Sequence, residues 1–523
     1  MTSTFPSALK ALLDGRAYPH AVDRITLIET HISWILLAGE FAYKIKRPVH
    51  LPFIDQRSLE RRHFLCLEEL RLNRRFAPTL YLEVVGITLQ EGEARLGGEG
   101  RAVEYTVRMR RFDRALELDR LLANRGVEPA ELASFGCHLA ELHAGLPRAS
   151  MSDPWGHPAA VRALVLENLE ETLQAARLIG RAEEVEVLRP QLLQKLDSTA
   201  PALRLRRQAG FVHEGHGDLH TRNIARIDGQ LLAFDCAEFD PAFRWIDVVD
   251  EAALLLVDLE ARGWPLHAHA FWSGYLEQSG DYDSHRVLNL YKAHRALVRA
   301  KIAALSIAPS TAPKERAALL DEHRALLRSA RQALAPREVL LLLICGVSGS
   351  GKTWLARHLA PILQLIHVRS DVERKRLGGL KPGSHSNSLL GQSLYSPAMT
   401  NAVYSRLCEC AEAILLGGYS ALIDATFSQR DERRRFAALA ARLGVRIGII
   451  HCRAEFPILK ARLAERARAR QDASEADARV LDWQMQRREP IAADEGMQVI
   501  EVDTSRPDLQ LFSEAAIRES FPA

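Results

Sequence analysis

Apolar residues gather in short runs along the first part of the chain, and turn residues separate these runs. Ala38-Gly39-Glu40 is the clearest turn, and Gly97-Gly98-Glu99-Gly100 is another. Short apolar runs between turns predict an antiparallel meander. Apolar positions among charged residues over 58–76 predict one helix, which Pro78 stops. The strands are predicted at 25–30, 34–37, 41–45, 81–87 and 104–112.

Helical periodicity replaces this pattern in the middle of the chain, and alternating strands and helices follow it. Helices are predicted at 131–143, 161–181, 185–196, 244–256, 291–305 and 315–334. Beyond Pro336, strands are predicted at 338–345, 364–368, 420–424 and 445–451, and helices at 352–363, across 371–415, 429–443 and 456–470. Such alternation is typical of a parallel α/β sheet. The expected fold class is therefore multidomain, an α+β part followed by an α/β part.

Size and charge restrict the function classes. At 523 residues the chain is too long for one ordinary core, so several domains are expected. A hydrophobic content of 47% and a net charge of +3 are typical of a globular protein with no bulk polyanion partner. The N-terminus shows no apolar signal segment, and no apolar run approaches ~20 residues, so we expect a cytoplasmic protein without a membrane span. The seven scattered cysteines are expected to be reduced thiols.

A glycine-rich segment follows the apolar run at 338–345 and precedes a helical pattern. It reads Gly346-Val347-Ser348-Gly349-Ser350-Gly351-Lys352-Thr353. Strand, glycine-rich loop, Gly-Lys-Thr and helix, in this order, make a phosphate-binding P-loop. Lys352 is predicted to contact the β- and γ-phosphates of ATP, and the Thr353 hydroxyl to hold Mg²⁺. The other predicted ATP-binding residues of this loop are Gly346, Gly349, Ser350 and Gly351.

The predicted N-terminal sheet carries further candidate ATP-binding residues. Its third strand contains an Ala-x-Lys sequence that ends at Lys44, and the helix after it contains Glu68 and Glu69. This layout resembles the small lobe of protein-kinase-like proteins, where such a lysine holds the α- and β-phosphates and a glutamate orients it. The resemblance implies Lys44, with Lys46 as the alternative, and Glu69, with Glu68 as the alternative. Because no Gly-x-Gly-x-x-Gly precedes Lys44, Ser33 and backbone amides are expected to cover the phosphates.

The densest group of polar residues lies in His216-Gly217-Asp218-Leu219-His220-Thr221-Arg222-Asn223, and a short hairpin then leads to Asp235. Phosphoryl transfer to a hydroxyl needs a carboxylate that accepts the hydroxyl proton and hard oxygen ligands for Mg²⁺. We therefore expect Asp218 as the catalytic base, and Asn223 and Asp235 as metal ligands. Asp247 is a candidate brace for this loop. A zinc site is not favoured, because the stretch offers too few soft ligands.

His-Gly-Asp-Leu-His-x-x-Asn over 216–223, followed by a strand with Asp235, resembles the aminoglycoside phosphotransferase family of the kinase-like fold. Leu139-Ala140-Glu141-Leu142-His143 is similar to the helix before the catalytic loop in that family. The resemblance covers about residues 20–308. It implies ATP-dependent phosphorylation of a small hydroxylated compound, without implying that this compound is an antibiotic.

The P-loop part, about residues 337–510, resembles small P-loop kinases of the gluconate kinase-like, chloramphenicol phosphotransferase-like and polynucleotide kinase-like groups. The resemblance implies Asp371 as a second catalytic residue that activates an acceptor hydroxyl, with Arg374 binding an anionic acceptor. It implies Asp424, at a strand end, as a Mg²⁺ contact. Arg466 and Arg470 are candidates for a lid over the ATP phosphates, with an exposed helix face as the alternative.

The whole arrangement resembles a bacterial two-domain family that joins an aminoglycoside phosphotransferase-like part to a P-loop kinase or AAA-type ATP-binding part. The expected divisions are a small lobe at 1–115, a helical lobe at 116–308, a linker at 309–336 and a P-loop kinase domain at 337–523. We expect a phosphotransferase with two nucleotide sites that uses ATP and Mg²⁺ and acts on small-molecule hydroxyl acceptors. No membrane or protein partner is expected, and nucleic acid is not favoured.

Three alternatives stay open. The first domain, which lacks the glycine loop, can be a degenerate kinase that binds nucleotide as a regulator. The P-loop domain can be an ATPase that drives a conformational change, although no coupling motif supports this. It can also be a polynucleotide kinase-like end kinase, which the near-neutral charge disfavours.

Overall fold

The computed structural model describes residues 5–51, 54–382, 384, 394, 396–469, 478–505 and 519–520. The chain forms two compact units. The first contains Met1–Glu131, Leu142–Leu164 and Leu203–Asp258, and the second contains Leu132–Glu141, Val165–Ala202 and Leu259–Ala523. The second unit therefore joins helices from the middle of the chain to the P-loop region, while the four divisions expected from the sequence stay predictions.

The first unit is built around a six-stranded antiparallel sheet in the order β1-β2-β3-β8-β6-β7. Its strands are β1 (Ile25–Glu29), β2 (Ser33–Ala38), β3 (Phe41–Lys46), β6 (Tyr81–Gln90), β7 (Glu93–Leu96) and β8 (Ala102–Arg110). The predicted meander is present, and β7 is an additional strand. Helix α1 (Leu59–Phe76) begins at Ser58, whose hydroxyl accepts from the Arg61 amide, and it packs on β8 and β6.

Two antiparallel pairs of short strands in the first unit flank the polar loop at 216–223. β9 (Val212–Glu214) pairs with β12 (Trp245–Asp247), and β10 (Ile224–Ile227) pairs with β11 (Gln230–Ala233). The sequence predicted a helix from residue 244, but residues 245–247 pair with β9, so helix α7 (Val248–Ala261) begins later. A further small pair is β4 (His50–Leu51) with β5 (Ile54–Asp55).

The remaining helices of the first 336 residues are mostly those that the apolar periodicity predicts. They are α2 (Leu118–Ala123), α3 (Pro129–Gly145), α4 (Pro158–Leu178), α5 (Ala182–Glu186), α6 (Arg189–Gln208), α8 (Pro265–Ser279), α9 (His285–Leu305) and α10 (Pro313–Leu334). Helix α10 occupies the predicted linker and packs along α9 through buried Leu326, Leu327 and Ala330. In the ranges described above, no helix combines the length and apolar character that crossing a membrane needs.

The P-loop region forms a five-stranded parallel sheet in the order β14-β15-β13-β16-β17. The strands are β13 (Leu340–Cys345), β14 (Leu365–Arg369), β15 (Ser420–Asp424), β16 (Arg446–Arg453) and β17 (Gln498–Asp503). β13 lies between two parallel neighbours, which explains its continuous apolar run. The alternation of strands and helices predicted this sheet, but it missed β17.

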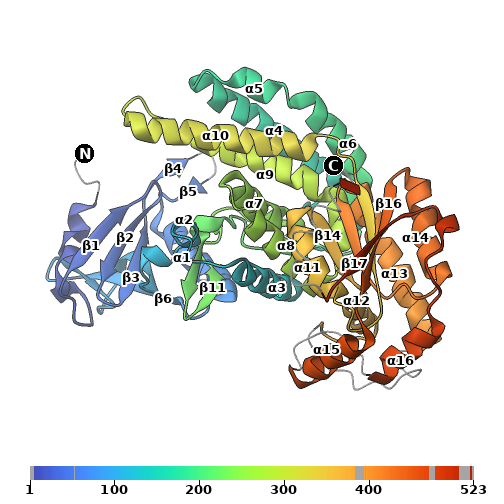
Figure 1. Ribbon diagram of the computed structural model, residues 1–523. Coiled ribbons are helices and arrows are strands. Elements are labelled where there is room, and N and C mark those ends of the chain that lie inside the picture. The colour runs from blue at the N-terminus through green and yellow to red at the C-terminus, as the bar shows by residue number, and fades with distance from the viewer. Residues whose placement is uncertain are drawn as a thin grey trace. The chain divides into compact units, whose positions relative to one another are not determined.

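Helices cover both faces of this sheet, and Figure 1 shows α11 on one side with α13 and α14 on the other. Residues of all five strands pack under α11, among them Leu342, Leu365, Leu422, Ile450 and Ile500. The helices are α11 (Lys352–Ile362), α12 (Ser370–Leu377), α13 (Pro397–Leu416), α14 (Arg430–Leu443), α15 (Phe456–Ala469) and α16 (Ala478–Arg487). The sequence did not predict α16.

Two arginines attach α12 and α13 to the carboxyl end of α8, inside the second unit. Arg376 donates to the Glu277 and Gln278 carbonyls at 2.6 and 3.0 Å, and Arg406 donates to the Gly280 carbonyl at 2.8 Å. Cations stabilise a helix carboxyl end because the last carbonyls have no partner within the helix. The second unit is therefore tied across the predicted linker by charged contacts.

Candidate functional sites

Lys44 lies between two carboxylates in the first unit. Its Nζ is 2.7 Å from Glu69 Oε1 on α1 and 2.5 Å from Asp235 Oδ1, which follows β11. Burial lowers the pKa of Lys44, but the charges of Asp235 and Glu69 outweigh it and raise the pKa well above its usual value. The structure thus brings together three predicted site residues that are far apart in the sequence.

Lys46, the alternative to Lys44, has a different environment. The side chains at 44 and 46 share one face of β3, and both reach Glu69. The Lys46 side chain is fully buried and donates to Glu69 and Glu238, whereas the Asp235 carboxylate next to Lys44 is 44% exposed. Lys44 is therefore the lysine at the accessible edge, and Lys46 is an internal ion-pair partner.

Asp218 and Asn223 meet in the polar loop. Asn223 Nδ2 donates to the Asp218 carbonyl at 3.0 Å and to Asp218 Oδ2 at 3.2 Å. The Asp218 side chain is 49% exposed, as a group that receives a substrate proton must be accessible. Asp235 adopts a left-handed backbone conformation with φ of 66°, which is uncommon for a residue with a Cβ and often marks a functional position.

Glu251 on α7 braces this loop, and the sequence interpretation missed it. Its carboxylate accepts from the His216 and Gly217 amides at 2.6 and 3.0 Å and from His143 Nε2 at 2.9 Å. Burial raises the pKa of Glu251, but the hydrogen bond with His143 and the nearby imidazoles lower it to about 2. Asp247, the predicted brace, instead forms a buried ion pair with Arg206 at 2.7 Å. Asp247 ends β12 and Glu251 lies in the first turn of α7, so only the packed structure shows which acid reaches the loop.

Ser33 occupies the turn side of β2, where the sequence predicts a cover for phosphates. Its amide donates to Thr30 Oγ1 at 2.9 Å, and Thr30 N donates to the Ser33 carbonyl at 2.9 Å, which closes the β1–β2 turn. The Ser33 side chain is buried, and its Oγ has no hydrogen-bond partner among the described residues. A phosphate contact from Ser33 stays a prediction.

The glycines of the P-loop have conformations and surroundings that exclude side chains. Gly346, Gly349 and Gly351 have φ of 144°, 83° and 81°. A Cβ at Gly346 would lie 2.5 Å from Ser350 Oγ, and a Cβ at Gly349 would lie 2.8 Å from the Leu459 carbonyl. The predicted backbone cradle is therefore present at the start of α11, where amides without helix partners favour an anion.

Thr353 and Asp424 meet beside this loop. Strands β13 and β15 are direct neighbours, with Ile344 opposite Asp424, and Thr353 Oγ1 donates to Asp424 Oδ2 at 2.7 Å. Burial raises the pKa of Asp424, but a hydrogen bond with His367 and the charge of Lys352 lower it to about 2. The carboxylate is thus ionised next to the hydroxyl that was predicted to hold Mg²⁺.

Residues outside the motif form hydrogen bonds with the P-loop backbone. The Ser348 amide donates to Gln484 Oε1 on α16 at 2.8 Å. Arg462 donates to the Gly349 carbonyl at 3.3 Å and to the Thr504 carbonyl at 2.7 Å. Arg462 thus contacts the loop backbone. No local motif marks these residues, which lie more than a hundred residues after the loop.

The predicted acceptor residues lie further along the sheet. Asp371 is in the first turn of α12 after β14, and β15 separates β14 from the P-loop strand. Arg374 donates to the Leu394 carbonyl at 2.9 Å and contacts Thr400 Oγ1 at 3.4 Å. The Arg466 side chain and the whole of Arg470 lie outside the described residues. The roles of Asp371, Arg374, Arg466 and Arg470 therefore stay predictions.

Both sites offer ligands that suit Mg²⁺. In the first, Asn223 uses its amide nitrogen toward Asp218, which leaves its amide oxygen for a metal beside the Asp235 carboxylate. In the second, the Thr353 hydroxyl donates its proton to Asp424, so the lone pairs of its oxygen stay available to a metal ion. In the described ranges, no three His, Cys, Asp or Glu residues form a metal-binding cluster. A Mg²⁺ site typically has few protein oxygens, and water and phosphate complete it.

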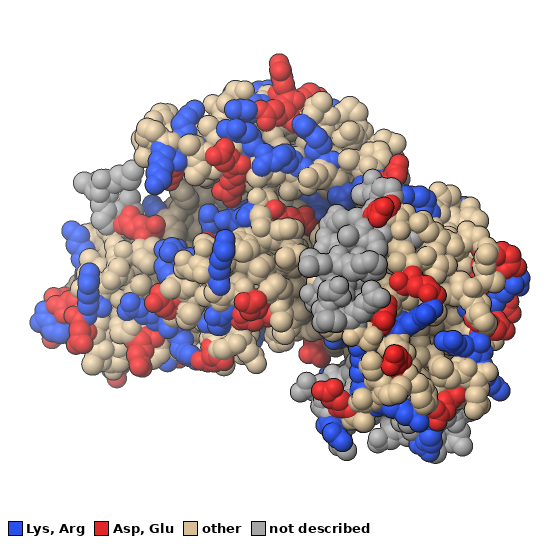
Figure 2. Space-filling view, in the orientation of Figure 1, with Lys and Arg blue, Asp and Glu red and all other residues tan. Residues whose placement is uncertain are grey.

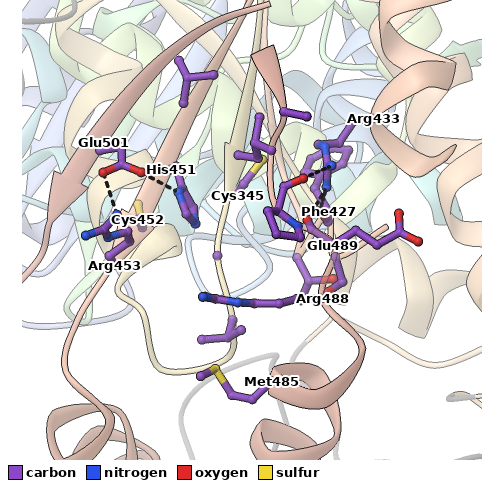
Figure 3. A pocket seen from close by; sticks show the side chains of 18 of the residues that line it. Cys345, Phe427, Arg433, His451, Cys452, Arg453, Met485, Arg488, Glu489 and Glu501 are labelled. Carbon is purple, nitrogen blue, oxygen red and sulfur yellow. Dashed lines mark hydrogen bonds and ion pairs between the residues drawn. The ribbon is translucent and has the colours of Figure 1, made fainter. Parts of the chain in front are cut away.

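A pocket of about 690 Å³ adjoins the P-loop at the carboxyl ends of β13 and β16 and against β17 (Figure 3). Gly346 and Val347 line it, and so do residues of α15 and α16. Its lining residues do not include Asp371 or Arg374. The pocket was not predicted from the sequence, because segments from five parts of the P-loop region form it.

Comparison with known proteins relates the chain to three mycobacterial proteins. Uncharacterized proteins of Mycobacterium bovis and of two Mycobacterium tuberculosis strains are each 30% identical over 478 residues, which is 90% of this chain and 93% of the relative. Residues 341–491 match the AAA domain family. Together with the loop geometry, this match supports a nucleotide-binding P-loop domain.

Solved kinase structures show weaker likenesses. The amicoumacin kinase hAmiN, in complex with AMP-PNP, Ca²⁺ and Ami, is 13% identical and covers 62% of this chain and 93% of its own, with a TM-score of 0.38. A putative kinase of Chloroflexus aurantiacus is 20% identical and covers 35% of this chain and 98% of its own, with a TM-score of 0.29. TM-scores this low carry no inference about the chain.

Proposed function

The chain belongs to the family of these mycobacterial proteins, and we propose that it is an ATP- and Mg²⁺-dependent phosphotransferase with two nucleotide sites. The first site lies in the kinase-like part, within residues 1–308, and the second in the P-loop part, within residues 337–523. Both act on hydroxyl groups of small molecules.

The position of Lys44 between Glu69 and Asp235 carries the proposal. A P-loop alone supports any nucleoside triphosphatase, but a lysine that bridges a helix glutamate and a metal-binding aspartate has a specific use in phosphoryl transfer. The distances of 2.7 and 2.5 Å join residues from three separate parts of the chain. A packing explanation accounts less well for the half-exposed Asp235, because buried lysines pair with buried acids, as Lys46 does.

In the first site, each side chain has a distinct task. Lys44 contacts the phosphates of ATP, and Glu69 fixes the position of its ammonium group. Asp218 accepts the proton of the acceptor hydroxyl, and the hydrogen bond from Asn223 orients its carboxylate. Mg²⁺, when bound to Asn223 and Asp235, neutralises phosphate charge during transfer. Glu251 fixes the position of the loop by accepting hydrogen bonds from the His216 and Gly217 amides, and His143 in turn donates to Glu251.

In the second site, loop amides hold the phosphates and Lys352 contacts the terminal ones. Thr353 and Asp424 would hold Mg²⁺, which would neutralise phosphate charge there. Asp371 would accept the acceptor proton, with Arg374 near an anionic group. An end kinase acting on nucleic acid is less well supported, since Figure 2 shows acidic and basic side chains interspersed on the visible face.

A transfer assay with an acceptor library tests the proposal. Wild type, Asp218→Ala and Lys352→Ala are incubated with ATP, Mg²⁺ and metabolite extracts, and products are read as a mass gain of one phosphate. Loss of a catalytic base typically lowers the rate ~10²–10⁴-fold, so Asp218→Ala should abolish one set of products and Lys352→Ala another. Asp23→Ala and Lys314→Ala, at exposed positions, serve as controls.

The outcomes separate the proposal from its alternatives. Products that survive Asp218→Ala unchanged would contradict a catalytic first domain and favour a nucleotide-binding regulator. Phosphate release to water alone, abolished by Lys352→Ala, would favour the ATPase. Transfer restricted to polynucleotide ends would favour the end kinase.

A further inference from the structure

The pocket beside the P-loop has the size of a small-molecule site. Its volume of about 690 Å³ lies within the roughly 300–1,000 Å³ that such sites occupy. It lies at the carboxyl edge of a parallel sheet, where ligands of open α/β sheets bind. Because Gly346 and Val347 line it, a ligand in it lies next to the start of the phosphate-binding loop.

Much of the lining is apolar. The apolar residues come from the segment after β15, from α15, from α16 and from β17, and include Phe427, Phe456, Leu459, Met485 and Val499. Two aromatic rings and a flexible methionine suit a flat or ring-shaped body, since such side chains bury a large area of ligand. A small inorganic ion would leave most of this surface uncovered.

Most charged residues of the lining already have hydrogen-bond or ion-pair partners. Arg433 pairs with Glu495 at 2.7 Å, and Arg453 pairs with Glu501 at 2.6 Å. Glu489 accepts a hydrogen bond from the Arg430 backbone amide at 2.6 Å, which binds its carboxylate without neutralising the charge. Burial lowers the pKa of His451, the imidazole in the lining, although Glu501 raises it, and the net shift disfavours a charge on this ring.

Arg488 is the exception. Figure 3 shows its side chain extending into the pocket, and within the described ranges its guanidinium has no hydrogen-bond or ion-pair partner. Its amide donates to the Gln484 carbonyl at 3.0 Å, and Gln484 is itself bonded to the P-loop at Ser348. Leu481 of α16 is also buried against Leu459 and Val347. Arg488 is thus placed at the pocket by a helix that is attached to the P-loop.

We propose that this pocket is a binding site for a small molecule with an apolar body and an anionic group, and that Arg488 holds the anion. An unpaired guanidinium at the edge of an apolar pocket recognises carboxylate, sulfonate or phosphate through two parallel hydrogen bonds. The site is distinct from the phosphate cradle, since its binding residues do not include Lys352 or Thr353.

Two fluorescent probes that differ in charge test the proposal. The full chain is titrated with 1-anilinonaphthalene-8-sulfonate and with its neutral analogue N-phenyl-1-naphthylamine. Arg488→Ala removes the cation, and Arg488→Lys retains a charge without the planar fork. Arg487→Ala is the matched control: Arg487 is next in sequence, carries the same charge and stacks on Trp483 at 5.1 Å, and it is absent from the lining.

Arg488→Ala should weaken binding of the sulfonate about tenfold or more, roughly the 1.4 kcal/mol of one charge-assisted hydrogen bond. Arg488→Lys should retain part of the affinity, and Arg487→Ala and the neutral probe should change little. Lys352→Ala should leave sulfonate binding intact, which separates this site from nucleotide binding. Equal effects of Arg488→Ala and Arg487→Ala, or an equal loss for the neutral probe, would overturn the proposal.

Discussion

The Ser348 amide in the P-loop donates a hydrogen bond to Oε1 of Gln484 at 2.8 Å, although 136 residues separate the two in sequence. The carbonyl of the same peptide unit, from Val347, accepts from Lys352 Nζ at 3.3 Å. A planar trans peptide points its N–H and C=O in opposite directions, so Gln484 keeps the carbonyl turned toward the lysine. Gln484 is therefore a positioning residue for Lys352.

Replacing Gln484 by methionine should weaken nucleotide binding to the P-loop. Methionine fills a similar volume but cannot accept a hydrogen bond as well, so the buried Ser348 amide loses its partner. An unpaired buried amide costs ~1–3 kcal/mol, which corresponds to a loss of about 5- to 150-fold in affinity for ADP. Isothermal titration of ADP with Mg²⁺ measures this change.

Gln486, exposed two residues later on α16, provides the matched control. Gln486→Met should leave ADP affinity unchanged, and hydrogen exchange over residues 346–352 should rise only in Gln484→Met. Equal affinities for wild type and Gln484→Met would show that the peptide keeps its orientation without Gln484.

Replacing each of the two lysines of β3 should have a different effect, one on stability and the other on nucleotide binding. Lys46 is fully buried between Glu69 and Glu238. Lys46→Met leaves buried carboxylate charge without its cation, so it should lower the free energy of unfolding by ~3–5 kcal/mol. Lys44→Met should leave a folded protein, because Glu69 keeps Lys46 as a partner, but should abolish nucleotide binding in the first site. Thermal unfolding and nucleotide titration of both variants test this contrast. A larger loss of stability in Lys44→Met would contradict these assignments.

Glu251 should make the first unit sensitive to acid. Its pKa is about 2 in the folded chain, against an ordinary value of 4.5, so its stabilising effect is complete above about pH 4.5 and is lost as pH falls toward 2. The difference is on the order of 3 kcal/mol, at ~1.4 kcal/mol per pKa unit. Glu251→Gln should therefore be less stable than wild type at pH 7 and approach it near pH 3.

Thermal unfolding of wild type and Glu251→Gln between pH 7 and pH 3 measures this convergence. Glu99→Gln, the same change on an exposed turn, should follow wild type at every pH. A gap between wild type and Glu251→Gln that stays constant with pH would mean that the carboxylate charge does not stabilise the loop.

The contact between α12, α13 and α8 gives a fourth prediction. Glu373 is fully buried and pairs with both Arg376 and Arg406 at 3.1 Å, and these arginines reach the end of α8. Glu373→Gln leaves two partly buried cations with one neutral acceptor, so unfolding should become easier by ~3 kcal/mol or more. Glu409→Gln, an exposed partner of Arg406, should change stability by less than about 1 kcal/mol. Similar shifts for both variants would contradict a structural role for Glu373.

The P-loop was predictable because its residues are contiguous. Three glycines, a lysine and a threonine in one segment define the cradle before any packing is known. The resemblance to small P-loop kinases adds Asp424, which lies at the end of a buried strand. The first site was predictable to the extent that Lys44, Asp218 and Asn223 lie in short recognisable segments. The choice between Lys44 and Lys46 depended on tertiary packing, since both side chains share one face of β3.

The missed features are those that depend on distant contacts. Glu251 and Asp247 are both acids near the start of one helix, and only the packed structure shows which one reaches the His216 amide. Gln484 lies on a helix that the sequence did not predict, and no local pattern links it to Ser348. Strand β17 was missed because it is an edge strand whose alternate residues are exposed, which weakens its apolar pattern.

The number of nucleotides bound per chain tests the central claim most directly. Isothermal titration with a non-hydrolysable ATP analogue and Mg²⁺ should give two sites for wild type, one for Lys352→Ala, one for Lys44→Met, and none for the double variant. A single site in wild type that Lys352→Ala abolishes would contradict the account, because the kinase-like part would then bind no nucleotide.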